Sequence, residues 1–150
     1  MKIYPHLWFE SQAEDAMAFY TSVFKDSQVL GQTKLPEPQL SVVRFELAGL
    51  PITALNAHSH TPYNEAFSFQ VETEDQAETD YYWNALSADG GEERPCGWLT
   101  DKFGVYWQVT PSILLRRVGD PDKAKARRVL QAMYQMKKII IADVERAYRG

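Results

Sequence analysis

The sequence predicts an α+β fold in which two βαβββ units follow one another and C-terminal helices complete the domain. Residues 7–24 align with residues 69–86 at a constant offset of 62. In both copies a short apolar run precedes a helical pattern, and three more strand-like runs follow it. The last run of each copy starts at a glycine, Gly49 or Gly104, at an offset of 55. A repeated order of elements of this kind indicates a duplicated unit.

The first unit covers residues 1–57 and begins with a strand over 3–9 and a helix over 12–24. Strands are expected near 27–34, 40–47 and 50–56. Ser11 and Glu14 have the spacing of a capping box, in which each side chain satisfies a backbone N–H of the first turn. The helical spacing predicts one buried stripe, formed by Ala13, Met17, Tyr20 and Phe24.

The second unit covers residues 64–111, after a loop over 57–65, and repeats the pattern with a strand over 66–72 and a helix over 75–88. Three further strands are predicted near 91–94, 97–101 and 104–109. Thr73 and Gln76 are the expected capping box, and the expected buried stripe contains Ala77, Tyr81 and Ala85.

Residues 112–150 are predicted to form a helical extension of the same domain, because no linker rich in Gly, Pro or Ser precedes them. Asp120 and Pro121 indicate an N-cap followed by proline at the first helical position. Apolar residues at helical spacing follow, namely Ala126, Val129, Leu130, Met133 and Met136. A second helix is expected over 138–148, so the extension holds two predicted helices.

Composition restricts the class of protein. The 150 residues are 45% apolar and 13% aromatic, which suits one packed domain. We expect a cytoplasmic protein without membrane association, since no apolar run approaches a membrane span and no signal peptide is visible at the N-terminus. The single Cys96 excludes an intrachain disulfide and agrees with a reducing compartment. Its neighbours include no general base, so we expect a turn residue rather than a nucleophile.

Charge is unevenly distributed along the chain. Residues 1–115 hold 6 basic and 16 acidic side chains, whereas residues 116–150 hold 10 basic and 4 acidic ones. The basic segment lacks glycine-rich or RNP-like aromatic motifs, so nucleic acid is not an expected partner. We expect these charges to be solvated or to complement the acidic body of the same or a partner subunit.

Several motifs resemble those of the vicinal oxygen chelate superfamily, which includes glyoxalase I, bleomycin-resistance proteins and extradiol dioxygenases, and more narrowly its PhnB-like branch. They run through almost the whole chain: PHLWF at 5–9, AEDA at 13–16, Phe19–Tyr20, ALN at 54–56, NEAFSFQV at 64–71, CGWL at 96–99, DKFGV at 101–105, WQV at 107–109, QAM at 131–133 and MKKI at 136–139. The resemblance implies a glyoxalase-like fold and a homodimer.

The PhnB-like branch often bears the name 3-demethylubiquinone-9 3-methyltransferase. A typical S-adenosylmethionine site has a glycine-rich turn after the first strand of a doubly wound parallel sheet. This chain has no such turn, because its only glycine pair, Gly90–Gly91, follows a predicted helix. The sequence therefore does not favour methyl transfer.

The superfamily places metal ligands on the first and last strands of the two units. Period-2 alternation assigns these positions here to Tyr4, Thr53 or its neighbour, Ala66 and Gln108. None of these side chains is an imidazole or a carboxylate, the groups that a tight divalent site needs. We therefore predict no bound metal and no other cofactor. If the strand register is shifted by two residues, His6 instead of Tyr4 takes the ligand position of the first strand.

The residues predicted to face the cleft combine aromatic rings with neutral hydrogen-bonding groups, which is typical of a small-molecule pocket. The predicted ligand-binding residues are His6, Trp8, Asn56, Ser68, Gln70, Trp98, Tyr106 and Gln108. In the opposite interpretation these groups only satisfy one another inside a closed barrel. Trp98 either covers one end of the cleft or fills core.

Three histidines remain to be placed. We expect a structural role for His6 beside Trp8, because no carboxylate neighbour is positioned to tune it. His58 and His60 form an H-x-H pair that could chelate a metal, but a solvent-facing loop is the expected context. Metal-free binding of a small organic molecule is thus the first hypothesis. The alternatives are a metal-dependent lyase or dioxygenase of glyoxalase type, a methyltransferase, and a structural or interaction module.

Overall fold

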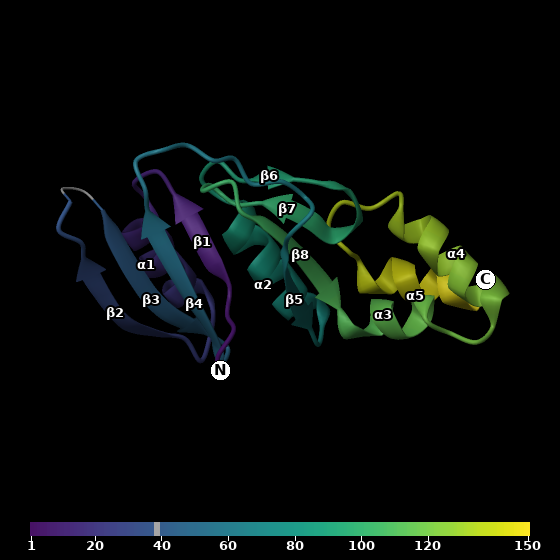
Figure 1. Ribbon diagram of the computed structural model, residues 1–150. Coiled ribbons are helices and arrows are strands. Elements are labelled where there is room, and N and C mark those ends of the chain that lie inside the picture. Colours follow the sequence, from purple (N-terminus) through teal and green to yellow (C-terminus); the bar gives the residue numbers. More distant parts are fainter. Residues whose placement is uncertain (38–39) are drawn as a thin grey trace. The chain divides into compact units, whose positions relative to one another are not determined.

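A computed structural model describes residues 1–37 and 40–150 and divides the chain into two compact units, Met1–Pro62 and Tyr63–Gly150. The first unit contains β1 (His6–Phe9), α1 (Ala13–Val23), β2 (Gln28–Lys34), β3 (Ser41–Leu47) and β4 (Leu50–Asn56). Its sheet has the order β1-β4-β3-β2, in which β1 and β4 are parallel and the other pairs are antiparallel (Figure 1).

The second unit repeats this topology and then extends it. It contains β5 (Phe69–Thr73), α2 (Gln76–Ser87), β6 (Glu92–Glu93), the 3₁₀ turn η1 (Pro95–Gly97), β7 (Trp98–Thr100) and β8 (Tyr106–Pro111). Its sheet order, β5-β8-β7-β6, again has one parallel pair, β5 with β8. The helices α3 (Ser112–Val118), α4 (Lys123–Met133) and α5 (Ile141–Arg149) follow. The predicted α+β class, with two βαβββ units and C-terminal helices, is confirmed.

Two predicted strands begin later than expected. Tyr4 precedes β1, and Ala66 lies in a turn before β5, where its N–H donates to Asn64 Oδ1 at 2.9 Å. The assignment of these two side chains to an inward strand face is therefore wrong, because period-2 alternation applies only within a strand.

Each sheet buries one face against its own helix. In the first unit Tyr20 of α1 packs on Phe45 of β3, with ring centroids 6.1 Å apart. In the second unit the largest fully buried side chain is Trp83 of α2, whose indole Nε1 donates to Glu93 at 2.8 Å. The helices lie on one face of their sheets in Figure 1, so the opposite face of each sheet carries the side chains that alternate with the core.

The stripe predicted for the first helix is confirmed at Ala13, Tyr20 and Phe24, with Met17 half-buried, whereas the stripe predicted for the second helix is wrong. In α1 the buried residues are Ala13, Ala16, Tyr20 and Val23. In α2 they are Thr79, Tyr82, Trp83 and Leu86, whereas Tyr81 is 48% exposed. The stripe predicted for α2 was wrong by one or two positions, although the offset of 62 itself relates the buried Tyr20 and Phe24 to the buried Tyr82 and Leu86.

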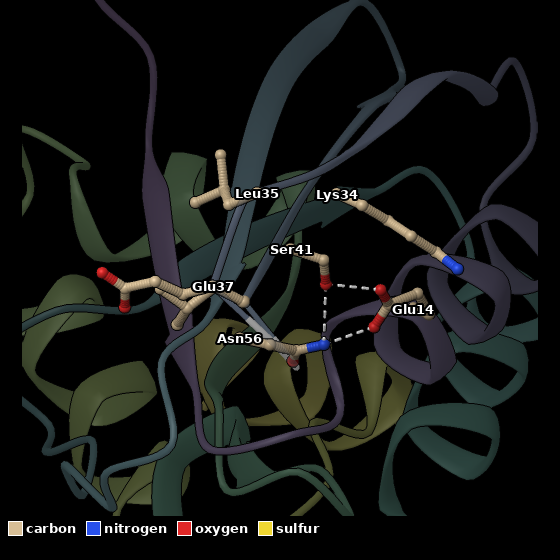
Figure 2. A pocket seen from close by; sticks show the side chains of 7 residues that line it. Glu14, Lys34, Leu35, Glu37, Ser41 and Asn56 are labelled. Atoms are coloured by element: carbon tan, nitrogen blue, oxygen red, sulfur yellow. Dashed lines mark hydrogen bonds between the residues drawn. The ribbon is translucent and has the colours of Figure 1, made fainter.

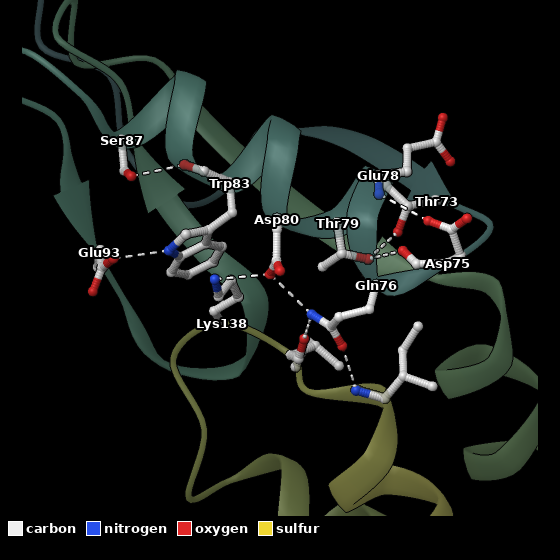
Figure 3. A network of polar contacts seen from close by, with 12 residues as sticks. Thr73, Asp75, Gln76, Glu78, Thr79, Asp80, Trp83, Ser87, Glu93 and Lys138 are labelled. Atoms are coloured by element: carbon white, nitrogen blue, oxygen red, sulfur yellow. Dashed lines mark hydrogen bonds and ion pairs between the residues drawn. The ribbon is translucent and has the colours of Figure 1, made fainter.

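Neither predicted capping box forms. The N-cap of α1 is Gln12, without a side-chain bond, and Ala13 N–H donates instead to Asn56 Oδ1 at 2.8 Å. The N-cap of α2 is Asp75, whose Oδ1 accepts from Glu78 N at 2.8 Å (Figure 3). Both helices thus satisfy their first N–H groups, but with partners other than the expected ones.

The extension contains three helices rather than two. The short α3 follows β8 directly, without a capping side chain that the sequence could have signalled. The N-cap of α4 is Asp122 rather than Asp120, since its carboxylate accepts from Ala124 N and Lys125 N. Leu114, Val129, Ile139 and Val144 form the core between these helices. Among the described residues, no helix is both long enough and apolar enough to cross a membrane.

The segment before α5 fastens the extension to the second unit. Gln76 of α2 donates to Ile139 O at 3.2 Å and accepts from Ile141 N at 2.8 Å. Lys138 Nζ lies 2.8 Å from Asp80 on the same helix, as Figure 3 shows. Gln76 is therefore a tertiary anchor and not the capping residue that the sequence suggested.

Candidate functional site

The face of the second sheet that points away from α2, called its open face here, carries five of the predicted ligand-binding residues. In β8, Trp107 and Val109 are buried, so Tyr106 and Gln108 point to the opposite face. Gln108 is the cross-strand partner of both Gln70 in β5 and Trp98 in β7, and partners share a face. Ser68 joins them, because Gln108 Nε2 donates to its Oγ at 2.9 Å. The alternation predicted from the sequence thus brings these side chains together.

Arg94 is the main residue of this face that sequence reasoning missed. It follows Glu92 by two positions in an extended segment, and Glu92 is paired with Thr100, which in turn is paired with Tyr106. The guanidinium Cζ lies 5.0 Å from the centroid of the Tyr106 ring, a cation–π arrangement. The available signal was the alternation of Glu92 and Arg94, but a two-residue strand is too short to display a pattern.

The polar partners of Arg94 are two carboxylates. Its Nη2 donates to Glu92 Oε2 at 3.1 Å, and its Nη1 lies 3.7 Å from Glu65 Oε2. Its Nε is buried and has no acceptor among the described residues. Arg94 thus retains hydrogen-bonding capacity that its own unit does not use.

A pocket of about 320 Å³ opens beside this arginine. Its walls are Glu65, Arg94, Pro95, Cys96 and Trp98. Cys96 has a left-handed backbone conformation, with φ 63°, and it lies in the η1 turn, as the sequence suggested. The backbone N–H groups of Cys96 and Gly97 donate to Met136 O and Lys137 O at 2.8 and 2.7 Å. The extension therefore supports the turn that forms one wall of the pocket.

The open face of the first sheet carries His6 and Trp8, as predicted, because Leu7 and Phe9 are the buried residues of β1. His6 Nδ1 lies 2.9 Å from Thr53 Oγ1, its cross-strand partner. Trp8 Nε1 donates to Ser59 O at 2.9 Å. His6 therefore has a hydroxyl neighbour and no carboxylate within hydrogen-bond distance in the described residues.

Asn56 does not share that face. It lies on the helix side of β4, alternating with Thr53 and Leu55, and only 5% of it is exposed. Its amide joins the start of α1 to the sheet, donating to Glu14 Oε2 and to Ser41 Oγ. Grouping Asn56 with the inward-facing residues was wrong, because an even-numbered position in β4 points toward the helix.

Glu14 is the centre of this polar cluster, shown in Figure 2. Burial disfavours its charged form, but hydrogen bonds from Ser41, Asn56 and Gln32 outweigh that effect and hold the pKa of Glu14 below its ordinary value of 4.5. A second pocket of about 300 Å³ lies above the cluster, and the carboxylate of Glu37 in its rim points away from Glu14 (Figure 2).

The groups available for a metal do not fit the ion that the fold family commonly holds. Of the predicted positions, Tyr4 and Ala66 precede their strands, Thr53 contacts His6, and Gln108 is bonded to Ser68. The imidazole and hydroxyl of the first unit, and the amide and hydroxyl of the second, each lack the charge and donor number of a tight divalent site. In the described residues no three His, Cys, Asp or Glu side chains cluster suitably for a metal.

His58 and His60 lie in the loop that follows β4. His60 Nδ1 is 4.0 Å from Glu10 Oε2, and both side chains are largely exposed. The backbone N–H of His58 donates to Glu10 O at 3.1 Å. The pair lies in the expected loop, and its histidines contact Glu10 in different ways.

Comparison with known proteins supplies the family. The family model described as 3-demethylubiquinone-9 3-methyltransferase matches residues 1–110. The search of curated proteins found no match. Among solved structures, a putative 3-demethylubiquinone-9 3-methyltransferase, PhnB protein, from Bacillus cereus is 28% identical, with a TM-score of 0.65 over 75% of this chain and 100% of that one.

Two more distant structures share the fold. A protein from Pseudomonas aeruginosa is 22% identical, with a TM-score of 0.59 over 74% of this chain and 97% of that chain. The fosfomycin resistance protein FosX from Listeria monocytogenes, solved as a mutant with Mn(II) and dihydroxypropylphosphonic acid, is 16% identical. Its TM-score is 0.58, over 73% of this chain and 90% of that chain.

The family match ends where the C-terminal helices begin and covers well over half of the chain. The PhnB protein and FosX have the glyoxalase fold of the vicinal oxygen chelate superfamily, with which the two βαβββ units agree. This chain therefore belongs to the 3-demethylubiquinone-9 3-methyltransferase family, in its PhnB-like branch.

Proposed function

We propose that this protein binds a small organic molecule, without a metal ion, on the open face of its second sheet. The observation that carries the proposal is the convergence of Trp98, Tyr106 and Gln108 beside a pocket of about 320 Å³. Aromatic surface with a few polar groups at its edge is the usual composition of a ligand site.

The polar groups of this face are not all consumed by one another. Gln108 donates to Ser68, but that bond uses one of the donors of the amide and leaves its carbonyl oxygen available. Gln70 is exposed next to it. Hydrogen bonds to a ligand are therefore possible without breaking those within the sheet, which favours binding over a purely structural role.

A metal-dependent lyase or dioxygenase is the alternative that the fold suggests. FosX is described with Mn(II), but a likeness at 16% identity concerns the fold alone. The groups nearest to the expected ligand positions are His6 and Thr53 in the first unit and Ser68 and Gln108 in the second, and in each unit they are a poor choice of ligands for a divalent ion. We therefore derive no chemistry from a metal.

The family name contains a methyltransferase activity, which the fold does not favour. A typical S-adenosylmethionine site uses a doubly wound parallel sheet with a glycine-rich first turn. Here each sheet has one parallel pair, and the connection from β1 to α1, Glu10–Gln12, contains no glycine. Binding without methyl transfer remains the proposal.

A fragment screen by ligand-observed NMR tests the proposal. We expect a set of small aromatic compounds to bind the wild-type protein and to lose most of their signal with Trp98→Ala or Gln108→Ala. Tyr134→Ala is the matched control, since Tyr134 is an exposed aromatic residue at the C-cap of α4, outside the pocket. Hits that all survive both substitutions in the sheet would contradict the proposal.

Titration with Mn²⁺ or Zn²⁺ tests the metal-free part. Calorimetry should detect no stoichiometric tight site, and His6→Ala should leave any weak binding unchanged. A tight site abolished by His6→Ala would instead support the metal-dependent alternative.

The homodimer expected from the resemblance is part of the same proposal. Sedimentation equilibrium would give a mass of twice 17.2 kDa. A single species of 17.2 kDa at high concentration would contradict it. Cytoplasmic location stays a prediction from the sequence.

A further inference from the structure

We infer that the pocket beside η1 selects a small aromatic carboxylate, whose carboxylate group pairs with Arg94 in the position that Glu65 now takes. This inference rests on the proposed function and specifies its ligand. Three features support it: the hydrogen-bond donors of Arg94 that have no acceptor, the weak ion pair between Arg94 and Glu65, and the apolar walls of the pocket.

Arg94 is a cation positioned by its surroundings before any ligand arrives. Its backbone N–H donates to Trp98 O at 2.8 Å, its guanidinium stacks on Tyr106, and Glu92 holds one side of it through Nη2. The side chain is 31% exposed, whereas its Nε is buried without an acceptor. A buried N–H without an acceptor is destabilising, so a ligand that supplies one gains binding free energy.

Glu65 shows which chemical group suits the free edge of this arginine. Its carboxylate is 3.7 Å from Nη1, beyond hydrogen-bond distance, and its side chain is 72% exposed. An exposed ion pair of this kind contributes little. A ligand carboxylate can therefore displace Glu65, reach Nη1 and, after a small rotation of the guanidinium, also satisfy Nε. Arginine is suited to this because its donors match both oxygens of a carboxylate.

The remaining walls favour a flat, apolar body. Pro95 and Trp98 line the pocket, and an indole offers a face on which an aromatic ring can stack. The volume, about 320 Å³, is at the small end of ligand pockets, which suits a single-ring compound.

A cationic ligand fits this pocket less well. It would have to lie next to the Arg94 guanidinium, and one of the two neighbouring carboxylates, Glu92, is already hydrogen-bonded to that group. Only Glu65 could serve a cation, and it lies 3.7 Å from Arg94 itself. Selection by charge should therefore favour anions.

Three probes of nearly equal shape test the inference: benzoate, benzamide and benzamidine, which are anionic, neutral and cationic. Calorimetry with the full chain should give at least about tenfold tighter binding of benzoate than of benzamide, the size expected for a charge-assisted hydrogen bond. Benzamidine should bind most weakly. Among the four indole N–H resonances, that of Trp98 should shift most, with Trp98→Phe used for assignment.

Substitutions of Arg94 and Glu65 then distinguish a direct contact with the ligand carboxylate from a general effect of the protein's charge. Arg94→Gln should abolish the preference for benzoate over benzamide, whereas Lys102→Gln, which removes a cation outside the pocket, should keep it. Glu65→Gln should tighten benzoate by about two- to fivefold and leave benzamide unchanged. Glu74→Gln removes an equal charge from outside the pocket and should have no such effect. Glu65 is exposed, so its variant tests the inference even if Arg94→Gln does not fold.

Equal affinities for the three probes, or a preference for benzamidine, would overturn the inference. If the probes bind equally and Trp98→Ala weakens all of them, the proposed small-molecule site stands and only its carboxylate selectivity fails. Absence of benzoate binding at millimolar concentration also overturns the inference, while the fragment screen decides the proposed function independently.

Discussion

The two βαβββ units share a topology but secure their helices in different ways. In the first unit Asn56, Ser41 and Glu14 join the start of α1 to the sheet, and Asn56 supplies the acceptor for the first helical N–H. In the second unit the start of α2 is capped locally by Asp75, and Gln76 and Asp80 are turned outward to the extension. Duplication has therefore preserved the arrangement of apolar elements while the polar contacts of each copy have diverged.

The difference also concerns the site. One wall of the pocket in the second unit is η1. The extension stabilises this turn, because Met136 and Lys137 accept hydrogen bonds from its backbone N–H groups. The family model matches residues 1–110, so these supporting residues lie outside the matched range. The extension thus adds to the second unit a support that the first unit does not have in its own sequence.

Of the substitutions that test this comparison, Ile139→Ala should reduce the stability of the protein most. Ile139 is fully buried in the core of the extension, and its Cγ1 packs against the position where Gly97 lacks a side chain. Loss of the side chain leaves a cavity, and we expect a loss of about 2–5 kcal/mol in the free energy of unfolding. Urea denaturation measures it.

The thiol reactivity of Cys96, the single cysteine, measures how the same substitution affects the η1 turn. In the Ile139→Ala variant, Cys96 should react faster with a thiol reagent, because the turn that contains it no longer packs against the Ile139 side chain. Leu115→Ala, at a position that is 40% exposed, is the control and should change stability by no more than about 0.5 kcal/mol. Unchanged Cys96 reactivity in a clearly destabilised variant would show that the extension does not hold the turn.

Asn56→Ala tests the first unit in the same way. The substitution leaves the buried Ala13 N–H without its acceptor and removes one of the three side-chain donors to Glu14, so we expect a loss of about 2–3 kcal/mol in the free energy of unfolding. Asp75→Ala removes the local cap of α2 and should lose only about 1 kcal/mol. Equal losses in the two variants would mean that the long-range and the local cap are equivalent, contrary to the comparison.

Most of this organisation was predictable, and the exceptions have physical reasons. The order of strands and helices and the open-face positions of His6, Trp8, Gln70 and Gln108 follow from periodicity, which depends on neighbours in sequence. The cap of α1 was missed because its acceptor lies 43 residues away. Arg94 was missed because β6 has two residues, too few for alternation to be visible. Tertiary contacts of this kind leave no local pattern.

Acidification should weaken the first unit through Glu14. Because its folded pKa lies below the ordinary value of 4.5, the charged form is stabilised by folding. Its contribution is fully present above about 4.5 and is lost as the pH falls through the folded pKa. Glu14→Gln should therefore flatten the pH dependence of the urea midpoint in this range, whereas Glu37→Gln, in the rim of the same pocket, should not. Identical acid profiles of wild type and Glu14→Gln would refute this assignment.

Lys138→Met should have the smallest effect, because the pair with Asp80 is partly exposed. The two side chains are 28% and 42% exposed, and an ion pair of this kind contributes about 0.2–1 kcal/mol. The hydrogen bond from Lys138, helped by Gln76, also lowers the pKa of Asp80, so the contribution of the pair should fade as the pH drops through that pKa. A double-mutant cycle with Asp80→Asn at neutral pH measures the coupling. A coupling well above 1 kcal/mol would mean that charge, rather than the burial of Ile139, fastens the extension to α2.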